Sequence, residues 1–247
     1  MNKSQAIPTH LGFIVDGNRR WAREKGLPTL HGHKKGMDKV ELVIDCLLER
    51  GIKYASFYVF STENWSRSQE EVDYLMELEK TMIKSLTKKM KKKGIRCLLM
   101  GSPVCPRPDI IENMQAAVKE TEDGENMTVC FCFNYGGHRE IADATSSLIA
   151  ERIAKARTLG EDADLSDLSD LTKVSIEDFA KHLYHPDVPP CDMIIRTSGE
   201  QRLSNFLLWR AAYSELLFLD RYFPDMDEAA VDDILAEFAS RHRRFGK

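Results

Sequence analysis

Residues 11–21 read LGFIVDGNRRW, in which a short apolar run ends at an acidic residue and continues into arginines. The run at 11–15 is bounded by a polar segment that contains glycine, which predicts a buried strand. Similar β-rich runs stand at 55–60, 96–100, 128–133, 193–195 and 216–219. Because helical patterns separate most of these runs, we expect an α/β fold with a mostly parallel, six-stranded central sheet flanked by helices.

The helices expected between the strands are amphipathic. Apolar residues repeat at helical spacing over 34–50 and again over 69–93, where the pattern ends in lysines. Further helices are expected at 18–25, at 108–118 and after an N-cap at Asp227. Faces of this kind usually cover a sheet, so we interpret them as core.

Length and charge restrict the classes of function. The 247 residues carry a net charge of −4, with 30% charged residues of both signs. This length favours a single domain over 1–247, and the lack of a basic field argues against nucleic acid as a partner. Six scattered cysteines without a CxxC pair indicate reduced thiols and a cytoplasmic location. An acidic repeat at 161–171 predicts an exposed insertion.

Contact with a membrane is expected to be peripheral at most. No stretch approaches the roughly 20 apolar residues that are needed to cross a bilayer. The lysines at 88–93 are interpreted as a solvated helix end, with contact to anionic lipid at the inner face of the membrane as the alternative.

Polar segments follow four of the predicted strands at 16–21, 61–67, 134–137 and 196–204. In a parallel sheet these strand ends meet at one edge, where ligands collect. The segments carry five guanidinium groups that match phosphate oxygens, on Arg19, Arg20, Arg67, Arg196 and Arg202. The carboxylate of Asp16 lies among them, and Mg²⁺ takes one or two carboxylates together with phosphate oxygens. The edge therefore predicts a site for a polyanion and Mg²⁺.

Simpler interpretations exist for each segment alone. Asp16-Gly17-Asn18 is a common turn sequence, and Arg196 and Arg202 could form only surface ion pairs. Their shared position after strands at one edge favours the functional interpretation.

Two other kinds of site have weaker support. The pairs His31/His33 and His182/His185 lack cysteine or carboxylate partners at zinc-ligand spacing. A nucleotide hydrolase with an α/β fold would need a GxxxxGK[ST] loop to bind phosphate, which the sequence does not contain.

Five ordered blocks carry a resemblance to a known family. They are Asp16-Gly17-Asn18-Xaa-Arg20-Trp21, Gly32-His33-Xaa-Xaa-Gly36, Phe60-Ser61-Xaa-Glu63-Asn64-Trp65-Xaa-Arg67, Asn134-Tyr135-Gly136-Gly137 and Arg196-Thr197-Ser198-Gly199-Glu200-Gln201-Arg202-Leu203-Ser204. With these blocks the chain resembles the cis-prenyltransferases, and among them the bacterial undecaprenyl diphosphate synthases, over nearly its whole length.

The resemblance implies an enzyme that condenses isopentenyl diphosphate in cis onto an allylic diphosphate, expected to be farnesyl diphosphate, with Mg²⁺. The expected product is a long-chain polyprenyl diphosphate, undecaprenyl diphosphate, for the carrier lipid of the cell wall. A synthase of shorter chains and a non-catalytic subunit of a heteromeric enzyme are the alternatives. Such subunits lose the aspartate and the Arg-Xaa-Ser element, which are present here as Asp16, Arg202 and Ser204.

The resemblance also implies roles for individual residues. Asp16 is the expected metal-binding and catalytic residue, Asn64 handles the proton, and Glu215 is a second metal-associated carboxylate. The allylic diphosphate is expected at Gly17, Asn18, Arg19, Arg20 and His33. Isopentenyl diphosphate is expected at Arg196, Arg202 and Ser204, and Ser61, Glu63, Trp65 and Arg67 complete the pocket. The substrate-binding set further includes Trp21, Thr62 and Leu203.

Assembly and the hydrocarbon chain complete the expectations. By analogy we expect a homodimer in which Arg244-Xaa-Gly246 reaches the partner's active site. A growing apolar chain must avoid water, so we expect an apolar tunnel between the sheet and the helical segments 37–48 and 72–90, with Val59, Phe131 and Phe133 as candidate wall residues. The sequence departs from the family at Thr29, where Arg is usual, at Ser68, where Pro is usual, and at Arg210, where Gln is usual.

Overall fold

The computed structural model describes residues 7–159 and 171–241, and its centre is a parallel sheet. The strands are β1 (His10–Ile14), β2 (Tyr54–Ser61), β3 (Ile95–Met100), β4 (Met127–Tyr135), β5 (Met193–Arg196) and β6 (Glu215–Phe218). They lie in the order β3-β4-β2-β1-β5-β6, and each neighbouring pair is parallel. The predicted six-stranded sheet is confirmed, and parallel pairing extends even to the edge strand β6.

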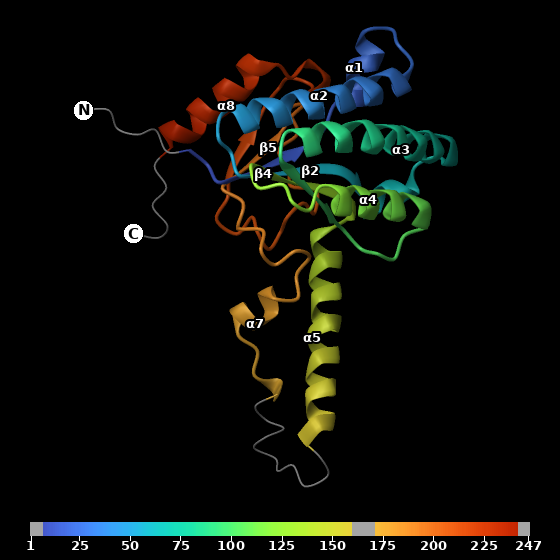
Figure 1. Ribbon diagram of the computed structural model, residues 1–247. Coiled ribbons are helices and arrows are strands. Elements are labelled where there is room, and N and C mark those ends of the chain that lie inside the picture. Colours follow the sequence, from blue (N-terminus) through green and yellow to red (C-terminus); the bar gives the residue numbers. More distant parts are fainter. Residues whose placement is uncertain (1–6, 160–170, 242–247) are drawn as a thin grey trace, which may run out of the picture.

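Four helices form a row over one face of the sheet (Figure 1). They are α8 (Glu228–Ser240), α2 (Thr29–Glu49), α3 (Gln69–Lys92) and α4 (Pro108–Glu120). Their apolar faces and the inward side chains of the strands form the larger core cluster. As predicted, Asp227 caps α8, accepting a hydrogen bond from the backbone N–H of Ala230 at 2.8 Å.

The other face of the sheet carries a second, smaller core cluster. Phe131 and Phe133 of β4 belong to the first cluster, whereas Cys130 and Cys132 point to the second, as strand alternation requires. From this side α5 (Gly137–Leu159) extends away from the sheet, and the short α7 (Ile176–Ala180) lies beside it (Figure 1). The sequence did not predict α5, because its outer half exposes Ile149 and Ile153 and lacks a clear apolar stripe.

The strand order creates a switch point between β1 and β5. From β1 the chain first builds β2, β3 and β4 on one side, and later adds β5 and β6 on the other side. Open α/β sheets bind ligands in the crevice at the carboxyl ends of such strands. β1 leads directly into Asp16, and β5 ends at Arg196, so the topology brings two candidate residues to this crevice.

Two further expectations concern the chain outside or near the limits of the described residues. The acidic segment predicted as an insertion lies outside them except for Leu171, and Arg244-Xaa-Gly246 lies wholly outside. Over 7–159 and 171–241, no helix combines the length and apolarity that a membrane span requires.

Candidate active site

An ion pair lies at the switch point of the sheet. Arg196 Nη2 stands 2.9 Å from Asp16 Oδ2, and its Nη1 donates to the carbonyl oxygen of Arg202 at 2.5 Å and to Ser204 Oγ at 2.8 Å. The Arg196 side chain is 5% exposed and the Asp16 side chain 30% exposed. Among the residues that the structure describes, Arg196 Nε has no hydrogen-bond partner. The buried Arg196 side chain is thus held by several hydrogen bonds, whereas the carboxylate of Asp16 is partly open to solvent.

Arg20 brings a second guanidinium to the same carboxylate. It reaches Asp16 Oδ1 at 3.7 Å and Glu200 Oε1 at 3.1 Å, and it donates to Ser198 Oγ. Arg202 pairs with Glu200 and is 59% exposed. The guanidinium of Arg202 faces solvent. Arg202 therefore contacts the site only through its ion pair with Glu200 and through its backbone carbonyl, which accepts from Arg196.

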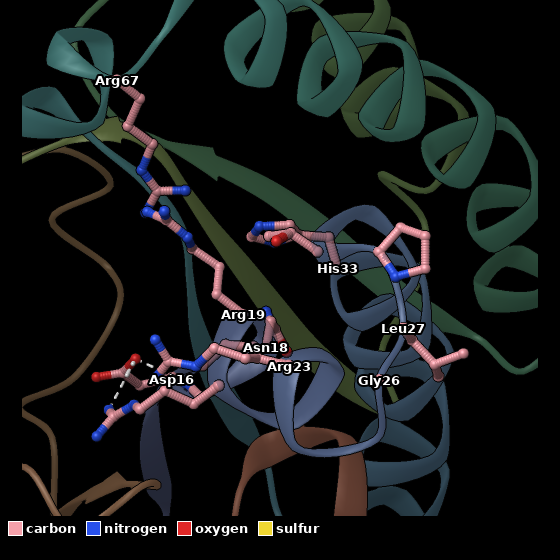
Figure 2. Close-up of a pocket in the computed structure, with 13 residues that line it drawn as sticks. Asp16, Asn18, Arg19, Arg23, Gly26, Leu27, His33 and Arg67 are labelled. Atoms are coloured by element: carbon pink, nitrogen blue, oxygen red, sulfur yellow. Dashed lines mark hydrogen bonds and ion pairs between the residues drawn. The ribbon is translucent and has the colours of Figure 1, made fainter.

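A cavity of about 760 Å³ opens in front of this cluster, lined by Arg19, Arg20, Arg23, Asp16 and Thr29 among others. Figure 2 shows the side chains of Arg19 and Arg67 extending toward each other across it, with Asp16 and His33 on either side. An adjoining cavity of about 190 Å³ shares Asp16, Asn18, His33 and Arg67 with it. Its remaining lining includes Ser61, Asn64, Arg196 and Ser204, with Val59 and Leu75 as apolar members.

Glu71 of α3 holds the cationic side of the cavity together. Its carboxylate lies 3.2 Å from Arg67, 3.4 Å from His33 Nε2 and 3.7 Å from Arg19. One carboxylate thus faces two guanidinium groups, leaving an excess of positive charge that suits a polyanion. Burial, together with the nearby Arg67, lowers the pKa of His33 to about 4, so this imidazole is neutral at pH 7.

The glycines of the first two motif blocks allow backbone and side chains to approach closely. Gly17 has φ of +99°, a conformation that other residues rarely adopt. A Cβ on Gly32 would lie 1.9 Å from Asn18 O, and a Cβ on Gly36 would lie 2.3 Å from Asn18 Oδ1. The short helix α1 (Asn18–Glu24) therefore packs directly on α2, and this contact holds its arginines over the cavity.

The third motif block forms the 3₁₀ turn η1 (Thr62–Ser66). Asn64 Oδ1 accepts a hydrogen bond from the backbone N–H of Ser61 at 3.1 Å, so the amide is fixed beside the smaller cavity. Trp65 donates to Asn134 Oδ1 at 2.8 Å, and Glu63 accepts from Asn205 at 3.1 Å. These last two contacts brace the turn.

Several predicted site residues do not line either cavity. They are Trp21, Thr62, Glu63, Trp65, Arg202, Leu203 and Glu215. Trp21 donates to Asp225 at 2.7 Å and is buried, which fixes α1 from behind. Leu203 packs against the smaller core cluster.

The structure separates Glu215 from Asp16. Glu215 begins β6 and pairs in register with Met193, at the amino end of β5, whereas Asp16 follows the carboxyl end of β1. Its carboxylate lies 3.0 Å from Arg241. Within one chain the two carboxylates therefore lie at opposite edges of the sheet, and the association of Glu215 with a metal ion stays a prediction.

Comparison with known proteins decides the family. Residues 14–246 match the family described as "Putative undecaprenyl diphosphate synthase". The chain belongs to the cis-prenyltransferase family. It is 41% identical to isoprenyl transferase 2 of Streptomyces avermitilis, over 98% of this chain and 81% of that protein. It is 40% identical to decaprenyl diphosphate synthase of Mycobacterium tuberculosis, over 97% of this chain and 77% of that protein.

A solved structure agrees with the fold. Lavandulyl diphosphate synthase from Lavandula x intermedia, in complex with dimethylallyl diphosphate, superposes with a TM-score of 0.86 at 28% identity. The match covers 98% of this chain and 99% of that chain. The family resemblance that rests on the five sequence blocks is confirmed. The six-stranded parallel α/β fold predicted from the strand and helix pattern is confirmed as well.

The donor atoms at Asp16 fit Mg²⁺ bound together with phosphate. Asp16 is the carboxylate common to both cavities, its side chain is partly exposed, and the guanidinium groups of Arg20 and Arg196 lie beside it. Among the described residues no cluster of three or more His, Cys, Asp or Glu could hold a metal ion. A cis-prenyltransferase site with one carboxylate suits a cation that takes most of its ligands from water and phosphate.

Sequence reasoning missed Glu71 and Glu200, which set the charge of the site. Glu71 follows Arg67 by four residues, a spacing that brings side chains together on a helix, so this signal was available. Glu200 lies within a quoted motif, but its partners Arg20 and Arg202 come from two segments that only the fold joins. Ser68, which replaces the usual proline, caps α3 by accepting from the backbone N–H of Glu71 at 3.4 Å.

Proposed function

We propose that this cis-prenyltransferase elongates an allylic diphosphate, farnesyl diphosphate, with isopentenyl diphosphate. The observation that carries the proposal is the Asp16–Arg196 pair, whose carboxylate is open to both cavities at the switch point, among Arg19, Arg20 and Arg67. Two adjoining cavities provide room for two diphosphate groups, which a condensation between two diphosphates requires. Arg19, Arg20 and Arg23 would bind the allylic diphosphate, and Arg196 with Ser204 would bind isopentenyl diphosphate.

The residues of the site support ionisation of the allylic C–O bond. Guanidinium groups aimed at the departing diphosphate stabilise the negative charge that develops there. Mg²⁺, when held by Asp16 and phosphate oxygens, would supply further neutralisation of this charge. The neutral His33 can donate or accept one hydrogen bond without adding a charge.

Condensation ends with the loss of a proton from the new carbocation. A carboxamide is a weak base, and Asn64 Oδ1 already accepts from Ser61 N–H. We therefore assign the proton to a diphosphate oxygen and a positioning role to Asn64. Full activity of Asn64→Asp would instead favour direct proton transfer to the side chain at this position.

A long undecaprenyl product requires more apolar space than the two polar cavities offer. An apolar cavity of about 10 Å³ lies between α3, α4 and the sheet, lined by Phe131 and Leu86 among others. Val59 lines the smaller polar cavity, and Phe133 lines neither. This small apolar volume favours a shorter-chain synthase as the second candidate.

Assembly as a homodimer is part of the proposal. α5 extends from the body and exposes Ile149 and Ile153, and the segment that returns beside it exposes Val174 and Ile176. Apolar side chains grouped on one projecting element are a common feature of interfaces. Size-exclusion chromatography with light scattering would test it, with Ile149→Glu as the disrupting variant.

Peripheral contact with anionic lipid is proposed for the lysine-rich side of α3. Lys84, Lys88 and Lys92 are exposed there and line one groove. Such a group attracts an anionic membrane surface. Sedimentation with phosphatidylglycerol vesicles against neutral vesicles would test it.

One assay tests the central proposal. Purified protein is incubated with farnesyl diphosphate, labelled isopentenyl diphosphate and Mg²⁺, and the products are sized by mass spectrometry. We expect elongated products, none with Asp16→Ala, and none when EDTA removes the metal. Undiminished elongation in EDTA, or no condensation by the wild-type protein, would contradict it.

A further inference from the structure

A carboxylate lies buried on the apolar face of α3. Glu79 is 3% exposed, and its Oε2 has no hydrogen-bond partner within 7–159 and 171–241. Among the ion pairs of the described residues, none includes Glu79. Burial alone raises the pKa of this carboxyl to about 8, with no charged neighbour contributing.

Two other polar side chains of α3, those of Thr87 and Glu71, have hydrogen-bond or ion-pair partners. Thr87 is also buried in α3, but its hydroxyl donates to the carbonyl oxygen of Ile83 at 2.6 Å. Glu71 at the start of the helix meets Arg19, Arg67 and His33. Glu79 has neither kind of partner, so packing within the chain gives no reason for an acid here.

The position of Glu79 lies between the polar and apolar cavities. Leu75, one helical turn before it, lines the 190 Å³ cavity beside Asp16 and Arg196. Ile83, one turn after it, lines the apolar cavity together with Met82 and Leu86. Residues four apart on a helix lie on the same face about 6 Å apart along the axis. Glu79 itself lines neither cavity, but its place on the helix lies between the residues that line them.

We propose that Glu79 limits the length of the polyprenyl product. The inference rests on the proposed function and deepens it. A hydrocarbon chain that grows from the diphosphate site along α3 meets the carboxyl of Glu79 before it can reach the apolar cavity. Contact with an unpaired carboxyl is unfavourable for hydrocarbon, so elongation stops and a short polyprenyl diphosphate is released.

The test compares two substitutions of similar size. Glu79→Leu removes the polar group and lets hydrocarbon pass, whereas Glu79→Gln keeps the shape and polarity. Glu77→Gln, on the exposed side of the same helix, is the matched control. Products from farnesyl diphosphate and labelled isopentenyl diphosphate are sized for all four proteins. We expect Glu79→Leu to extend the main product by at least one isoprene unit, with the other three proteins alike.

A binding measurement separates this inference from the proposed function. Dissociation constants for farnesyl and geranylgeranyl diphosphate are measured by thermal shift, which requires no turnover and also reports folding of each variant. Glu79→Leu should improve binding of the longer diphosphate about tenfold relative to Glu79→Gln, because more methylene groups enter apolar surroundings.

The outcomes are distinct. Equal product lengths and equal preferences for the two diphosphates in Glu79→Leu and Glu79→Gln would overturn the role of Glu79 while leaving the synthase intact. Absence of condensation in every protein would contradict the proposed function, and the binding comparison would then decide the role of Glu79 alone. A wild-type product already as long as that of Glu79→Leu would also overturn it.

Discussion

Two arginine–carboxylate pairs, each with a buried arginine, occupy different regions of this molecule. Arg196 and Asp16 lie at the carboxyl edge of the sheet. Arg210 and Glu140 lie 2.7 Å apart, beside the smaller core cluster on the other face of the sheet. Arg210 also donates to the carbonyl oxygens of Tyr184, His185 and Val188, while Glu140 accepts from Tyr135 OH and Tyr184 N–H. Their side chains are 3% and 1% exposed.

The difference lies in what each pair leaves unsatisfied. The Arg210–Glu140 pair is closed, because each partner is surrounded by hydrogen bonds of the chain itself. The Arg196–Asp16 pair keeps a free Nε and a carboxylate open to a cavity. A buried ion pair thus indicates a binding site only where part of its bonding capacity remains. Arg210, where the family usually has Gln, is explained by its partner Glu140.

The largest expected effect separates activity from stability at the open pair. Asp16→Asn should lower kcat by about 10²- to 10³-fold, because the carboxylate that would bind Mg²⁺ is lost. The melting temperature should change by less than about 2 °C, since Asp16 is partly exposed. Steady-state kinetics and calorimetry check this, with the exposed Asp38→Asn as control. A large loss of stability with activity retained would reverse the assignment of the two pairs.

At the closed pair the expected effect is on stability. Arg210→Gln should cost about 3–5 kcal/mol of unfolding free energy, because Glu140 remains as a buried, unpaired charge. The double variant Arg210→Gln/Glu140→Gln should recover a large part of this loss. Urea denaturation measures both. If the single and double variants were equally destabilised, the charge of Glu140 would not be the cause.

Each region also contains a buried histidine, which makes stability depend on pH. Burial lowers the pKa of His10 to about 4, and burial together with the nearby Arg67 lowers the pKa of His33 to about 4. Between pH 6.5 and 4 the unfolded chain binds protons that the folded chain does not. Stability is therefore present above pH 6.5 and is lost as pH falls toward 4, by up to about 3 kcal/mol per histidine.

Single variants distinguish the two histidines. His10 contacts Ser56 and Pro189 within the core, whereas His33 faces the open cavity. Denaturant titrations at several pH values should show a shallower pH slope for His10→Gln and for His33→Gln than for wild type. An unchanged slope in either would mean that this histidine is protonated in the folded state.

The smallest expected effect adds charge to the open region. Thr29 lines the same cavity as Arg19 and Arg23. Thr29→Arg should lower KM for the allylic diphosphate about threefold with kcat nearly constant, because one more guanidinium reaches a partly solvated anion. Thr29→Gln controls for side-chain length. Equal KM values in the two variants would show that a positive charge at position 29 does not strengthen binding of the allylic diphosphate.

Much of the fold and part of the site could be predicted from the sequence. Short β-rich runs located every strand to within about two residues, and parallel order then placed Asp16 beside Arg196. α5 was missed because a projecting helix needs no continuous apolar stripe. Glu215 was assigned to the metal by resemblance alone, and only strand register reveals that it begins β6 at the far edge.

Glu79 illustrates a different limit. Its spacing from Leu75 and Ile83 put it on the apolar face of α3, and that pattern was visible in the sequence. Whether it had a partner depended on residues from other elements, which periodicity does not describe. Sequence patterns predicted positions in this molecule better than they predicted which polar groups stay unsatisfied.

The contact of Asn18 with Gly32 and Gly36 limits how helix α1 can move when a substrate binds. Because the backbone oxygen and the side chain of Asn18 fill the space where Cβ atoms on these two glycines would lie, α1 is interlocked with α2. Ion pairs of Lys89 with Glu41 and of Lys93 with Asp45 join α2 in turn to α3. The backbone of α1 is therefore expected to move over the cavity only together with α2 and α3, a collective displacement on a timescale of about microseconds to milliseconds, whereas its exposed arginine side chains change rotamer within nanoseconds.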